Sequence, residues 1–221
     1  MLRGSPTENA TGVLLFADYF DLKALHYTVH ELAGGLNEAV PEQKAQQDLL
    51  LNFAYEVRKG FSGERQTQGM SFSEDQHSLY FGFQVVWTDM LVFMSTLRAC
   101  AGLFSTDKLQ QSMMYMLEHA VEEAMLSYDE VGAHKIREYT KRGIDTYSPY
   151  AFIAYQAAHI DFVTRKAGKT RFRNIPKLID SYFNQDTRDY KEFIQSLAHS
   201  ARMQNCRIEQ LSYSDFPEIE W

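Results

Sequence analysis

One stretch near the middle of the chain is apolar on almost every side. It reads MLVFMSTLRACAGLF over residues 90–104 and follows Thr88-Asp89, a pair typical of a helix start. A helix without a polar face is normally buried within its domain. The stretch contains Arg98 and is shorter than the ~20 residues that span a bilayer, so we expect no membrane partner. Other elements must therefore enclose this helix.

The composition supplies the side chains for such a core. Of the 221 residues, 45% are hydrophobic and 14% aromatic. The apolar run near the N-terminus is interrupted by Asp18 and is too short for an export signal. The two cysteines, Cys100 and Cys206, form neither a metal-binding spacing nor a disulfide framework. We therefore expect a cytoplasmic protein without a cofactor.

The remaining patterns predict an α+β fold that is mostly helical. LYFGFQVVW (79–87) and residues 13–16 have the composition of strands, and residues 60–78 read as a polar loop with an edge strand near 70–73. Helical periodicity or start signals occur near residues 22, 41, 88, 107, 130, 149, 176 and 187. We predict a small antiparallel sheet from the first 90 residues, covered by about seven or eight helices. Residues 1–221 form a single domain in this interpretation, and 60–78 is the only candidate boundary.

The segment RKAGKTRFRNIPK (165–177) contains the Gly-Lys-Thr that closes a phosphate-binding P-loop. A P-loop also needs a glycine at position 163, where this chain has Val163, and it follows a strand. Here a helix is predicted to end at Gly168. The motif therefore does not predict nucleotide binding.

The same segment carries the most concentrated positive charge of the chain. Its charge is +6 against −13 for the remainder, which disfavours general nucleic-acid binding. If residues 169–173 are extended, three of the charges project from one side. We predict an anion-binding or partner-binding surface here; the alternative is a solvated loop that complements the acidic remainder. The candidate residues are Arg165, Lys166, Lys169, Arg171, Arg173 and Lys177.

Three histidine arrangements are candidates for parts of a site. His26 and His30 are four apart on one helix, which makes them weak metal candidates without a third ligand, so no metal is predicted. His119 and Glu123 have the same spacing on a later helix. His159 falls near the apolar face of its helix, where a buried histidine with a hydrogen-bond partner, such as a backbone carbonyl, is the usual explanation and a catalytic base the alternative.

Two strand-to-helix units carry a resemblance. GVLLFADYFDLKALHYTVHEL (12–32) and YFGFQVVWTDMLVFMSTLR (80–98) resemble small bacterial proteins grouped only as domains of unknown function. The resemblance implies a bacterial source and carries over no catalytic residue.

Two functional hypotheses remain. The first is a non-catalytic cytosolic interaction protein, self-associating or meeting an anionic partner at residues 165–177. The alternative is a hydrolase-type enzyme, metal-assisted or not, whose site is assembled from dispersed histidines and carboxylates. The first hypothesis rests on the isolated positive segment and on the absence of any complete catalytic motif in the sequence.

Overall fold

The computed structural model describes residues 1–73 and 76–221, with side chains described outside 70–78. The strands are β1 (Arg3–Pro6), β2 (Gly12–Ala17), β3 (Gln66–Ser73) and β4 (Gln76–Val86). The helices are α1 (Tyr19–Gly34), α2 (Pro41–Phe61), α3 (Trp87–Leu103), α4 (Lys108–Tyr128), α5 (Glu130–Arg142), α6 (Ala151–Thr164), α7 (Lys169–Arg173), α8 (Ile175–Phe183) and α9 (Arg188–Gln204). A 3-10 helix, Ile208–Gln210, follows α9. Within the described residues this confirms the predicted α+β class, with one short helix, α7, beyond those expected.

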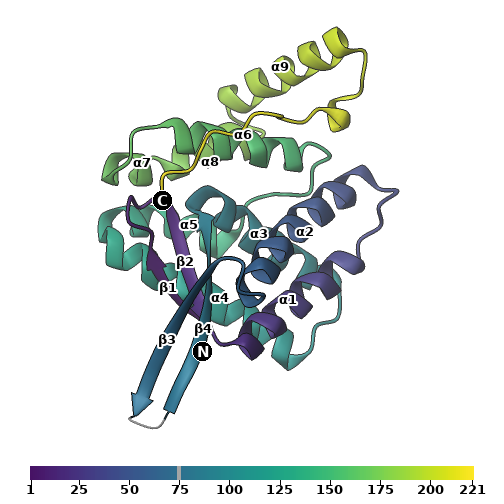
Figure 1. Cartoon of the computed structure of the whole chain (residues 1–221). Coiled ribbons are helices and arrows are strands. Elements are labelled where there is room, and N and C mark those ends of the chain that lie inside the picture. Colours follow the sequence, from purple (N-terminus) through teal and green to yellow (C-terminus); the bar gives the residue numbers. More distant parts are fainter. Residues whose placement is uncertain (74–75) are drawn as a thin grey trace.

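The strands form one antiparallel sheet in the order β1-β2-β4-β3. Gly12 of β2 pairs with Val86 of β4, and Gln66 of β3 pairs with Gly82 of β4. The polar loop predicted for 60–78 is therefore wrong: most of it is β3 and the start of β4, in a hairpin that extends away from the helices (Figure 1). Local composition missed β3 because pairing with β4 supplies its hydrogen bonds, whatever its polar side chains favour. The expected edge strand lies within β3, while residues 74–75 lie outside the described part.

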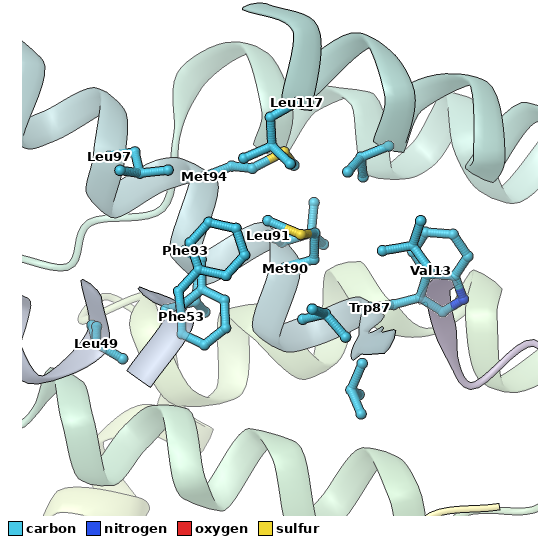
Figure 2. Packing of buried hydrophobic residues seen from close by; sticks show 14 of the residues in the cluster. Val13, Leu49, Phe53, Trp87, Met90, Leu91, Phe93, Met94, Leu97 and Leu117 are labelled. Carbon is cyan, nitrogen blue, oxygen red and sulfur yellow. The ribbon is translucent and has the colours of Figure 1, made fainter. Parts of the chain in front are cut away.

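Helix α3 is the centre of the packing, as its apolar sequence predicts. Its first eleven residues are all buried. Figure 2 shows Phe93 of α3 beside Phe53 of α2, with ring centroids 5.1 Å apart, and Met94 beside Leu117 of α4. Elements from both sides of segment 60–78 share this core, as the single-domain interpretation requires. The domain division itself stays a prediction.

The segment after α6 differs from the sequence interpretation. Helix α6 ends at Thr164, four residues before Gly168, and Gly168 instead precedes α7 with a φ of +129°. The extended conformation expected for residues 169–173 is wrong, because these residues form a helical turn whose Phe172 is fully buried. Burial of that ring against Trp87 and Tyr128 decides the local conformation over the alternating sequence pattern.

The last segment crosses back over the molecule. From the end of α9 it runs past α6 and α8 to the sheet, so that the C-terminal end lies beside β2 (Figure 1). Trp221 packs against the hydrophobic core. This return brings the segment over the pocket described next.

Candidate functional site

A pocket lies between α2, the β3–β4 pair, the start of α3, α6 and the last segment. Its volume is about 510 Å³, within the range of small-molecule sites. The residues that line it combine aromatic, amide and ionisable side chains. They are Asn52, Glu56, Arg65, Gln66, Phe83, Gln84, Val85, Val86, Asp89, Phe93, Tyr155, His159, Ile219 and Trp221.

Asp89 is a buried acid in the first turn of α3. Only 5% of its surface is exposed, and the hydroxyl of Thr88 donates to its Oδ1 at 3.1 Å. A carboxylate in this turn interacts favourably with the positive end of the helix dipole. That interaction alone does not compensate the burial of a charge, so the acid needs a closer partner.

His159 of α6 is that partner. Its Nδ1 lies 2.7 Å from Oδ2 of Asp89, and 8% of its surface is exposed. Burial acts to lower the pKa of His159, but the charge and hydrogen bond of the Asp89 carboxylate raise it above its ordinary value. His159 is thus buried with a hydrogen-bond partner, as the sequence predicts, but the partner is not a backbone carbonyl. A carboxylate 70 positions away takes its place.

The Asp89 contact leaves the other ring nitrogen of His159 available. Because a carboxylate only accepts hydrogen bonds, Nδ1 carries the proton and Nε2 of the neutral ring is an acceptor. Nε2 has no partner among the described residues and is not among the buried polar atoms that lack one. It is therefore open to the pocket. The ring of Phe216 meets His159 edge to face at 5.8 Å and restricts how it can turn.

Further polar groups border the pair. The hydroxyl of Tyr155 accepts from the Asn52 amide at 3.1 Å; burial, and then the nearby Asp89 carboxylate, raise the Tyr155 pKa well above its ordinary value. Arg65 donates to both carboxylate oxygens of Glu56, at 2.8 and 2.9 Å. Glu56 and Arg65 thus compensate each other's charge, whereas the charge of Asp89 is compensated only while His159 is protonated.

The cations of segment 165–177 do not form one outward surface. Arg165 pairs with Asp161 at 2.8 Å, while Asp129 accepts from Arg173 at 2.7 Å and lies 3.7 Å from Lys169. These three cations are already paired with carboxylates, and two of them share Asp129. Lys166 and Lys177 are exposed and have no partner in the described part of the chain.

Arg171 departs furthest from the sequence interpretation, which has it projecting outward. It is 6% exposed, donates to Thr11 Oγ1 at 2.8 Å and lies over the ring of Phe162 at 4.7 Å. Its Nε is buried without a hydrogen-bond partner. Arg171 therefore holds the loop before β2 against α6. Its outward projection is wrong, whereas anion binding by the segment is not tested by these contacts.

The other histidines do not assemble a site. His26 and His30 have ring centroids 4.4 Å apart; burial, and then His30 and two neighbouring cations, lower the His26 pKa. His119 and Glu123 are exposed on α4. Among the described residues, no group of three or more metal-ligating side chains could hold an ion. His26 and His30 therefore remain two ligands without a third.

Fold and site together define an α+β protein with a histidine–carboxylate pocket. The chain belongs to the family described as "Domain of unknown function (DUF6904)", whose model matches residues 2–221. No curated protein and no solved structure matches it. The resemblance to domains of unknown function is confirmed to this extent, and the bacterial source stays a prediction. Every helix in the described residues is too short or too polar to serve as a membrane span.

Proposed function

We propose that the pocket binds a small molecule and that His159 transfers a proton to or from it. The observation that carries the proposal is the 2.7 Å contact between Nδ1 of His159 and Asp89, with Nε2 open to a cavity of about 510 Å³. An imidazole oriented by a buried carboxylate is a recurrent general acid–base arrangement. The geometry thus favours the enzyme hypothesis over the non-catalytic one.

The side chains present favour direct proton transfer over a covalent route. The described residues that line the pocket include no serine, threonine or cysteine. In the proposed step, neutral Nε2 takes a proton from a water molecule or hydroxyl as its oxygen attacks the bound molecule. Asp89 stabilises the imidazolium, which then returns the proton to the leaving group. This sequence amounts to hydrolysis when the attacking oxygen is that of water.

The charges around the pocket favour an uncharged, hydrogen-bonding ligand. Arg65 is held in both directions by Glu56, and Asp89 is paired with His159. With His159 in the neutral form that acts as the base, Asp89 leaves one buried negative charge beside the pocket, which disfavours an anionic ligand. The amides of Gln66 and Gln84 can both donate and accept, which suits amide, ester or heterocyclic groups.

The test is a screen of uncharged polar fragments followed by NMR of the histidine imidazoles, with p-nitrophenyl acetate as a hydrolysis probe. We expect the bound fragments to shift the His159 resonance and lose affinity in His159→Gln. Hydrolysis should rise as the pH passes the His159 pKa, because the base is the neutral ring. His134→Gln, on the exposed face of α5, is the matched control. Fragments that bind elsewhere with His159 unaffected would refute the proposal.

A second candidate, the predicted anionic contact at 165–177, rests on two exposed lysines without partners, Lys166 and Lys177. Reversing the charge of Arg171 or Arg173 would destabilise the fold as well as affect binding, because both side chains make internal contacts. The discriminating variant is Lys166→Glu with Lys177→Glu, and Lys135→Glu on α5 is the control. Weaker salt-dependent retention on heparin for the double variant alone would support the contact; equal retention would end it.

Self-association and a cytoplasmic location also stay predictions. Light scattering of the purified chain tests the first, and fractionation of its host tests the second.

A further inference from the structure

Residues 213–221 form one side of the candidate pocket and come from the end of the described chain. Ile219 and Trp221 line the cavity, and Phe216 lies edge to face against His159. Phe216 is nevertheless 47% exposed, and the segment is neither helix nor strand. We call residues 213–221 the strap.

A few side-chain contacts attach the strap to the body. The Asn9 amide donates to the backbone oxygen of Trp221 at 2.9 Å, and the Thr11 hydroxyl donates to that of Glu220. At the other end, the backbone N–H of Tyr213 reaches the Gln156 side chain at 3.4 Å. Ile219 and Trp221 also pack against the hydrophobic core, but most residues of the strap are exposed, so it opens at lower cost than the helices beneath it.

We infer that the strap is a movable wall of the pocket, docked over His159 in this structure and released from it in a minor state. The inference rests on the proposed function for its purpose. The docked strap adds apolar surface to the ligand site and removes water from His159. The released strap lets the ligand enter and leave the pocket. Ligand and strap docking then stabilise each other by the same factor, because binding linkage is reciprocal.

The contact between Phe216 and His159 gives this movement a chemical consequence. Release removes the ring that packs against the imidazole, so that His159 becomes more accessible to solvent and to a reagent. Phe216 is therefore a positioning residue, and the reactivity of His159 should report the position of the strap.

The chain has two tryptophans, which suit an experiment without any ligand. Trp87 is fully buried in the core and serves as the internal reference, whereas Trp221 belongs to the strap. With 5-fluorotryptophan incorporated, ¹⁹F NMR follows both, and Trp221→Phe assigns them. The rate at which diethyl pyrocarbonate modifies His159 is measured in the same samples by mass spectrometry.

We expect Asn9→Ala, which removes one strap hydrogen bond from an exposed side chain, to raise the released fraction about 2- to 10-fold. The Trp221 resonance should move toward that of the denatured chain while Trp87 stays. His159 modification should accelerate in both Asn9→Ala and Phe216→Ala. Glu8→Ala, an exposed neighbour, is the matched control.

Two results would overturn the inference. If the Trp221 resonance and the rate of His159 modification are unchanged in both variants, the strap is a fixed part of the fold. A wild-type Trp221 resonance equal to that of the denatured chain would show a strap that does not dock. Failure of the proposed function looks different, because fragments then fail to bind while the strap variants still change Trp221 and His159.

Discussion

The contact between Asp89 and His159 leads to a pH-dependent stability that can be measured without knowing the ligand. Asp89→Leu removes the carboxylate and leaves a buried imidazole without its partner. Breaking a buried ion pair from one side costs about 3–5 kcal/mol. Losing a hydrogen bond between a carboxylate and a neutral ring costs about 1.5–3 kcal/mol. The variant should therefore lose more stability where His159 is protonated than where it is neutral.

The direction of the pH dependence follows from the raised pKa of His159. Burial alone would lower that pKa, but Asp89 raises it above the ordinary value of 6.5. A group whose pKa is higher in the folded state stabilises fully below 6.5 and loses this contribution as the pH rises through the folded value. We expect the cost of Asp89→Leu to be about 3–5 kcal/mol at pH 6 and to fall toward about 1.5–3 kcal/mol at alkaline pH.

Urea unfolding across this pH range, followed by tryptophan fluorescence, measures the effect. A double-mutant cycle with His159→Phe isolates the pair, because the helix-dipole contribution of Asp89 occurs in both arms and cancels. Asp107→Ala, which removes the N-cap acid of α4, is the control and should cost about 1 kcal/mol at every pH. A coupling energy that is constant with pH, or grows as the pH rises, would refute the reasoning.

Three further predictions concern the rest of the fold. Arg173 lowers the pKa of Asp129 to about 2, so the contact stabilises the wild type above pH 3.8 and this stability is lost as the pH falls toward 2. Arg173→Gln should remove this contribution, which acid titration followed by circular dichroism measures. Gly132→Ala places a methyl group against the Phe172 ring, and we expect a loss of about 1–3 kcal/mol in urea unfolding. Burial raises the pKa of Cys100 to about 12, so its reaction with a thiol reagent should wait for unfolding, and mass spectrometry of the native chain should find it unmodified.

The sequence predicts most of the fold because periodicity and capping act locally. The helix starts at Asp107 and Thr187 are confirmed by side-chain caps in the structure, and the apolar residues of α3 are buried as expected. The failures occur where a distant partner decides. Strand β3 exists because β4 pairs with it, and α7 is helical because Phe172 inserts between Trp87 and Tyr128.

The sequence predicts one residue of the candidate site, His159, but not its pairing with Asp89. The position of His159 on an apolar helix face makes it a candidate, whereas the sequence around Asp89 indicates only a helix start. One sequence signal could have suggested the pairing. An acid in the first turn of an otherwise buried helix needs a buried partner, and a histidine on an apolar helix face, such as His159, can be that partner. The 70 positions between them hide the pairing, and the strap over them follows no local pattern.

Whether the pair serves stability or chemistry can be decided by replacing both residues. Apolar residues of similar volume often match or exceed a buried ion pair in stability, because they avoid the cost of removing two charges from water. We therefore expect the double variant, Asp89→Leu with His159→Phe, to unfold within about 1 kcal/mol of wild type, although Asp89→Leu alone is strongly destabilised. The same double variant should lose fragment binding at the pocket and the pH-dependent hydrolysis. If it is as unstable as Asp89→Leu alone, the pair is a structural requirement and its orientation is no argument for proton transfer.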